Sequence, residues 1–134
     1  MYLVVRPVWA NRNLTPEEIQ ITNTLYEVFL RVVTERQSLI HQVKALQETR
    51  GKQRVATAMG NVIDDLFKRY VHAAITRGDL PQDLRITPRG AKGPDLWLDR
   101  IAWDITTAEQ SQAHIERDVI GDRLRWDVYF VLGY

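Results

Sequence analysis

Apolar residues recur at helical spacing over most of the first half of the chain, and this period is the strongest constraint on the fold. Between Pro16 and Gly51 the chain contains no proline or glycine. The apolar positions lie three or four residues apart, which places them on one face of a helix. Thr15 can cap such a helix, and Pro16 suits its first position. We therefore expect one helix over 15–50, or two helices that meet near Thr34–Ser38.

A second helical pattern covers residues 55–75, and Gly78 is placed to end it. Beyond it, short apolar runs alternate with Gly and Pro, which indicates strands and turns. We expect strands at 84–87, 95–98, 100–106 and 126–132, a hairpin turn at Asp99-Arg100, and a helix at 107–119 with Thr107 as its cap. The order from residue 55 is thus helix, three strands, helix, strand, which predicts an α/β core behind an N-terminal helical layer.

Length and composition exclude several classes of protein. A chain of 134 residues predicts a single domain, with 1–54 as a helical extension and 55–134 as the core. The absence of cysteine excludes disulfide scaffolds, thiolate zinc sites and cysteine nucleophiles. No apolar run is long enough to span a membrane, and the first residues do not read as a secretion signal.

Charge is segregated along the chain although the formal net charge is only +1. Residues 51–92 hold 8 basic and 4 acidic side chains, a net +4, whereas residues 93–134 hold 4 and 8, a net −4. A basic stretch beside an acidic one can serve as a track for phosphates that leads to a cation site. The alternative is a solvated helix face followed by a loop.

Two acids stand out in the second half of the chain. Asp95 follows Gly93-Pro94, and Asp104 lies in a run that is otherwise apolar or β-branched. A hairpin that turns at Asp99-Arg100 pairs position 95 with about position 104, with Cβ atoms about 5 Å apart. Two carboxylates at that distance favour a cation, and hard oxygen donors can hold Mg²⁺, with Mn²⁺ as a substitute. Such an ion can activate water and stabilise charge on a phosphodiester.

The alternative for this pair is structural. Gly-Pro-Asp is a common turn sequence, so Asp95 can simply cap a turn, and Asp104 can be a solvated strand residue. An acid within a buried strand pattern is costly unless it is paired or bound to a metal. The setting of Asp104 therefore favours the metal site.

Three segments together resemble a known family. Gly93-Pro94-Asp95, Trp103-Asp104-Ile105-Thr106-Thr107 and Gln110-Ser111-Gln112-Ala113-His114 look like the C-terminal nuclease domains of bacterial polymorphic toxins. Those domains have the restriction-endonuclease-like PD-(D/E)xK fold, whose core is helix, three strands, helix, strand. The resemblance covers about residues 60–134 and does not extend to residues 1–55.

The resemblance implies roles for particular residues. Asp95 and Asp104 would bind Mg²⁺, and Asp64, in Gly60-Asn61-Val62-Ile63-Asp64-Asp65, would be a further metal ligand, with Asp65 the weaker candidate. The spacing Gln110-x-x-x-His114 is similar to an element that positions DNA or the active site in one nuclease branch. His114 can carry a proton, because its ordinary pKa lies near neutrality.

One position departs from the family pattern. The motif has a lysine two residues after the second acid, and here that residue is Thr106. A threonine hydroxyl can orient water but supplies no positive charge. Lys92 and Arg89 in the preceding turn, or Lys68 one helical turn after Asp64, are candidates to supply the charge and to bind nucleic acid.

The resemblance implies a Mg²⁺-dependent endonuclease that acts as an antibacterial toxin module. It would cleave DNA in the cytoplasm of a competing bacterium, after delivery as part of a larger secreted protein, and a cognate immunity protein would block it in the producer's cytoplasm. Two alternatives stay open. The substrate can be tRNA or another RNA. The chain can also be a catalytically degenerate module that binds a partner or a second copy through its N-terminal helices, which the missing motif lysine favours.

Overall fold

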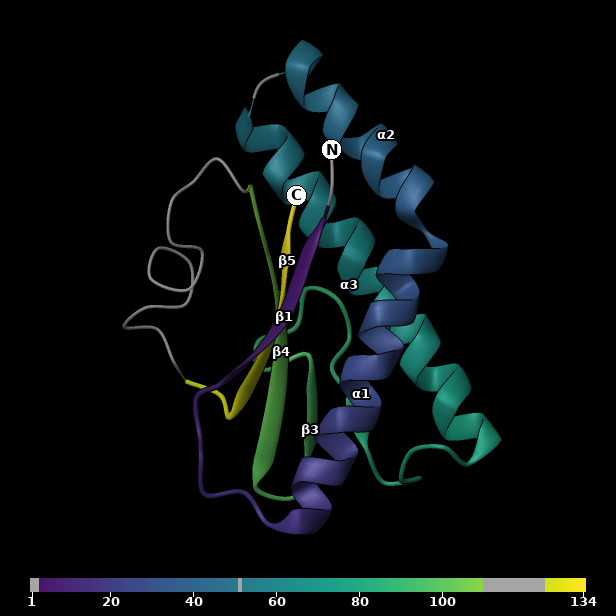
Figure 1. Ribbon diagram of the computed structural model, residues 1–134, viewed down its shortest axis with the longest axis vertical. Coiled ribbons are helices and arrows are strands. Elements are labelled where there is room, and N and C mark those ends of the chain that lie inside the picture. The colour runs from purple at the N-terminus through teal and green to yellow at the C-terminus, as the bar shows by residue number, and fades with distance from the viewer. Residues whose placement is uncertain (1–2, 51, 110–124) are drawn as a thin grey trace.

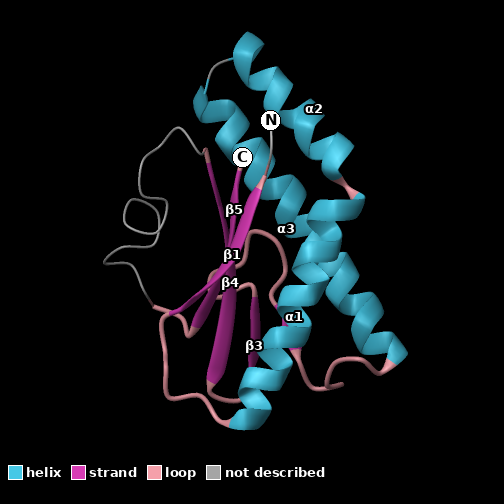
Figure 2. Cartoon of the chain, in the orientation of Figure 1, coloured by secondary structure: helices cyan, strands magenta, loops and turns pink. Residues whose placement is uncertain are grey.

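The computed structural model is an α/β protein with three helices and a five-stranded mixed sheet in the described part of the chain (Figure 1). Residues 3–50, 52–109 and 125–134 are described, residues 47–50 and 52–57 as helix backbone alone. The elements are β1 (Val4–Trp9), α1 (Pro16–Glu35), α2 (Gln37–Arg50), α3 (Lys52–Arg77), β2 (Arg85–Ile86), β3 (Leu96–Leu98), β4 (Ile101–Ala108) and β5 (Val128–Gly133). Figure 2 shows the helices grouped on one side of the strands.

The sheet has the strand order β1-β5-β4-β3-β2. The strands β2, β3 and β4 form an antiparallel meander, and β5 runs parallel to β4. All six residues of β5 are buried, because alternate side chains pack in two apolar clusters. The order α3, three strands and a final strand confirms the prediction for those elements of the core.

The first strand corrects the prediction for the N-terminal segment. We expected residues 1–54 to be a helical extension, but β1 pairs antiparallel with β5 and belongs to the sheet. Pro7 lies opposite Phe130 within this strand. Proline has no N–H to donate, so it is tolerated in a strand at the edge of a sheet, and β1 is an edge strand. The N-terminal layer is therefore part of the core.

The helices follow their sequence signals closely. The Thr15 side chain accepts a hydrogen bond from the Glu18 N–H, and the Glu18 carboxylate accepts one from the Thr15 N–H, which makes a complete capping box. The helical segment 15–50 divides at Arg36, inside the predicted interval. Gly78 ends α3 with φ of 86°, a conformation that favours glycine.

The predicted hairpin is present, but Thr107 and Ala108, the first residues of the predicted helix after it, belong to a strand. Asp99 has φ of 49° at the turn between β3 and β4, as a tight hairpin requires. Thr107 was expected to cap a helix, but it lies inside β4, opposite Leu132 of β5. Its β-branched side chain suits a strand. The rest of the predicted helix, from residue 110, lies outside the described residues.

The main core lies between the helices and one face of the sheet. Phe29 of α1, Phe67 of α3 and Phe130 of β5 are fully buried, with ring centroids 5.4 to 6.0 Å apart. The indole N–H of Trp103 donates to the hydroxyl of Thr22 at 2.9 Å, so both buried polar groups are satisfied. These contacts hold α1 and α3 against β4 and β5. None of the helices in the described residues is long and apolar enough to cross a membrane.

Candidate active site

The hairpin formed by β3 and β4 brings Asp95 and Asp104 together. Leu96 lies opposite Trp103, so one further step along the antiparallel register places Asp95 opposite Asp104. The Asp95 N–H donates to Asp104 Oδ1 at 3.1 Å, and the Ile105 N–H donates to Asp95 Oδ2 at 2.8 Å. The predicted pairing of the two acids is confirmed. Backbone hydrogen bonds also hold both carboxyl groups in position.

Helix α3 adds a lysine and a third acid to this pair. Lys68 Nζ lies 2.9 Å from Asp64 Oδ1 and 3.3 Å from Asp95 Oδ1. The side chains of all three are largely buried, with exposed fractions of 13 to 17%. Asp64 and Lys68 are four residues apart and therefore share one face of α3. Residues from α3, from β4 and from the position just before β3 thus form one cluster, which we call the acidic cluster: Asp64, Lys68, Asp95 and Asp104.

The electrostatics of the acidic cluster favour a cation. Burial, together with the neighbouring carboxyl of Asp104, raises the pKa of Asp95 to about 6. Burial also raises the pKa of Asp104 and that of Asp64 above their ordinary value. Three carboxylates against one ammonium leave two formal negative charges when all are ionised. Gathering like charges in a poorly solvated place is unfavourable unless protons or a cation neutralise them.

The donors present suit a hydrated Mg²⁺ bound by two carboxylates. This ion usually takes one or two protein carboxylates and keeps several waters, which leaves positions for phosphate oxygens. Asp95 and Asp104 are such a pair, and burial raises the pKa of both carboxyl groups. The predicted third ligand, Asp64, instead forms an ion pair with Lys68. Within the described residues, no group of three or more His, Asp or Glu side chains is arranged to hold a metal ion.

Lys68 is the basic residue that reaches the acids. Of the three candidates to replace the motif lysine, it alone contacts a carboxylate of the acidic cluster in the described part of the chain. Arg89 and Lys92 are exposed in the turn before Asp95 and make no ion pair with these acids. The sequence spacing from Asp64 indicated this reach, but three candidates stood equal until α3 was placed against the sheet.

The remaining predicted residues have different outcomes. Thr106 lies on β4, opposite Val131, and is half-buried. Being two residues after Asp104, it belongs to the same side of the strand. Gln110 and His114 lie outside the described residues. One participant was missed: the backbone N–H of Ile105, which holds the Asp95 carboxyl and which no side-chain motif could reveal.

Comparison with known proteins gives no match. No protein-family model matches the chain, and no curated protein or solved structure is significantly similar to it. The function of the acidic cluster must therefore be inferred from its geometry and chemistry.

Proposed function

We propose that this protein is a divalent-metal-dependent nuclease with a restriction-endonuclease-like core, and that DNA is its substrate. The observation that carries the proposal is the buried pair Asp95 and Asp104, held face to face by backbone hydrogen bonds with Lys68 beside it. A fold gains nothing in stability from two adjacent buried carboxylates, so their presence is best explained by a cation that acts in function.

In this proposal each residue of the acidic cluster has a separate task. Asp95 and Asp104 hold Mg²⁺ or Mn²⁺, which when bound supplies electrostatic stabilisation of the charge that develops on the phosphodiester. Lys68 supplies the fixed positive charge that Thr106 lacks and contacts the phosphate. Asp64 holds the Lys68 ammonium in place through their ion pair. The hydroxyl of Thr106 is suited to orient a water molecule.

The surface before Asp95 supports a polyanionic substrate. Arg89 and Lys92 are exposed in this turn, and no acidic partner is seen for either in the described residues. Unpaired basic side chains beside a cation site favour contact with a phosphate backbone. The RNA alternative has the same electrostatic requirements, so the assay includes both nucleic acids.

The biological part of the proposal comes from the motif resemblance. Asp95 after Gly93-Pro94, and Asp104 at the centre of 103–107, are the positions that resemble polymorphic toxin nucleases. We propose that the domain acts in the cytoplasm of a competing bacterium and that a cognate immunity protein neutralises it. Expression of the chain in bacteria, with and without Asp104→Asn, tests the toxicity directly.

A cleavage assay tests the catalytic proposal. Purified protein is incubated with supercoiled plasmid and, separately, with tRNA, in Mg²⁺, in Mn²⁺ and in EDTA. We expect metal-dependent plasmid cleavage that Asp104→Asn and Asp64→Asn both reduce strongly. Asp65→Asn is the matched control, because Asp65 is the next residue on α3 but pairs with Arg69 on the exposed side. This control should cleave like the wild type.

Two outcomes would contradict parts of the proposal. Cleavage of tRNA with intact plasmid would replace DNA by RNA as the substrate and keep the site. No cleavage of either substrate in either metal, together with no Mn²⁺ binding by calorimetry, would favour the degenerate interaction module.

A further inference from the structure

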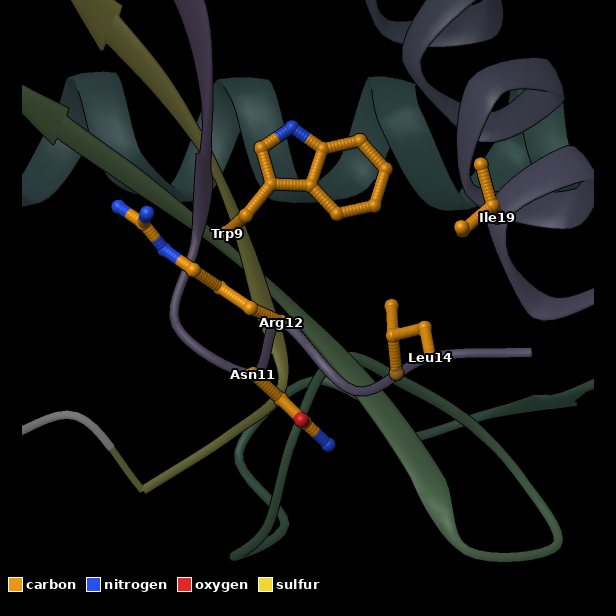
Figure 3. Close-up of a pocket in the computed structure, with 5 residues that line it drawn as sticks. All are labelled: Trp9, Asn11, Arg12, Leu14 and Ile19. Atoms are coloured by element: carbon orange, nitrogen blue, oxygen red, sulfur yellow. The ribbon is translucent and has the colours of Figure 1, made fainter. Parts of the chain in front are cut away.

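A cavity lies where β1 ends and α1 begins, and none of the acidic cluster lines it. It has a volume of about 370 Å³ and is lined by Trp9, Asn11, Arg12, Leu14 and Ile19. Figure 3 shows the Trp9 ring, Leu14 and Ile19 arranged around the space, whereas the Arg12 side chain extends from the rim away from Leu14 and Ile19. The volume is within the range of ligand pockets in proteins.

Hydrogen bonds to Asp127 hold the wall of this cavity in place. The N–H groups of Ala10 and Asn11 donate to the Asp127 carbonyl at 3.0 and 2.9 Å. The Asn11 side-chain amide donates to the Asp127 carboxylate at 2.8 Å, and the Asn13 N–H donates to Asn11 Oδ1 at 2.9 Å. The segment that carries Arg12 is therefore fixed before any ligand arrives, which lowers the entropic cost of binding.

The lining has the chemistry of a site for an aromatic ring attached to an anion. Trp9 offers an aromatic face that is only half-buried, and Ile19 is 40% exposed on the opposite wall. Arg12 is exposed and makes no ion pair or hydrogen bond in the described residues, and none of the described residues that line the cavity is acidic. A partly exposed indole inside the cavity and an exposed guanidinium at its rim suit a nucleobase and the adjoining phosphate, because every base has a face that stacks.

We infer that this cavity binds an unstacked base of a nucleic acid strand, with the base against Trp9 and the adjoining phosphate at Arg12. The choice of a nucleic acid rests on the proposed function. Trp9 lies opposite Val128, which lies opposite Trp103, the residue before Asp104. Two strand spacings, about 10 Å, therefore separate the backbones of residues 9 and 103.

Binding measured without cleavage tests the inference. Fluorescence anisotropy with a labelled short oligothymidine is recorded in EDTA for the wild type, Trp9→Leu and Arg12→Gln. The matched controls are Trp97→Leu, another exposed tryptophan, and Arg31→Gln, another exposed arginine. We expect Trp9→Leu to raise Kd at least about 5-fold. Arg12→Gln should weaken binding and reduce the salt dependence by about one phosphate contact. Both controls should bind like the wild type.

Two further probes distinguish binding through the bases from binding through the phosphates. An abasic strand of equal length should bind the wild type and Trp9→Leu alike, because it keeps the phosphates and lacks the bases. Thymidine monophosphate should compete with the oligothymidine only at the cavity, and its effect should disappear in Trp9→Leu.

The inference and the nuclease proposal fail in different ways. Equal oligothymidine binding by Trp9→Leu, Arg12→Gln and both controls would overturn the proposal that the cavity binds a base. It would leave the proposal of metal-dependent cleavage intact. Binding that depends on Trp9 and Arg12 in a protein that cleaves nothing would keep the cavity and reject the nuclease. A Trp9→Leu protein that does not fold leaves Arg12→Gln to decide, since Arg12 is exposed and supports no part of the core.

Discussion

Replacing Asp95 with asparagine removes one negative charge from the acidic cluster and keeps the shape of the side chain. The asparagine oxygen can still accept the hydrogen bond that the Ile105 N–H donates at 2.8 Å. Its amide takes the place of Oδ1, which loses the ion pair with Lys68 but also removes the repulsion between the two carboxylates. We therefore expect Asp95→Asn to be more stable than the wild type at neutral pH in the absence of metal, and about equally stable near pH 4.

The size of this effect follows from the raised pKa of Asp95. Its pKa is 3.8 as the ordinary value and about 6 in the folded protein. A carboxyl whose pKa rises on folding contributes stability below its unfolded pKa, and this contribution is lost as pH increases through the folded value. The difference of about 2 in pKa corresponds to about 3 kcal/mol at most. Because the side chain is still 17% exposed, we expect ~1–3 kcal/mol.

Urea unfolding followed by circular dichroism, in EDTA and from about pH 4 to about pH 8, measures the two stability curves. The wild-type curve should fall between about pH 4 and pH 6 relative to that of Asp95→Asn. Asp79→Asn, which removes an exposed carboxylate paired with Arg77, is the control and should follow the wild-type slope. Parallel curves for the wild type and Asp95→Asn, or a less stable variant at neutral pH, would refute the electrostatic reasoning.

Three other variants test separate parts of the structure. Lys68→Met should reduce Mg²⁺-dependent plasmid cleavage about 100-fold or more, because it removes the fixed charge beside Asp95; near-normal cleavage would assign that role elsewhere. Thr22→Val should cost about 1–3 kcal/mol in urea unfolding, since the buried Trp103 N–H loses its acceptor, and an unchanged midpoint would speak against it. Gly78→Ala should cost about 1–2 kcal/mol in thermal unfolding because φ is 86° there; a neutral effect would show that the helix end relaxes.

The elements that sequence predicted well are those with local signals. The capping box at Thr15 and Glu18 sets the start of α1, and Gly78 sets the end of α3. The tight turn at Asp99 sets the hairpin register and so the pairing of Asp95 with Asp104. Each signal acts within a few residues along the chain, so it can be recognised without knowledge of the fold.

The predictions that were wrong concern segments whose structure depends on residues far away in the chain. The segment Val4–Trp9 is a strand because it pairs with β5, more than a hundred residues later. Threonine is a common helix cap, and Thr107 was predicted to be one. Because β5 extends alongside β4, β4 continues as a strand through residue 107. Local preference is weak compared with the hydrogen bonds and burial that a neighbouring strand supplies.

The acidic cluster combines a feature that the sequence predicts with one that depends on tertiary packing. The sequence alone determined that Asp95 and Asp104 face each other, because a short hairpin has one register that buries Leu96 and Leu98. Only the tertiary structure decided which basic residue joins them. Phe67 packs in the core and so fixes the rotation of α3, and from that position Lys68 reaches Asp95. Side-chain packing between a helix and a sheet is not encoded in any short stretch of sequence.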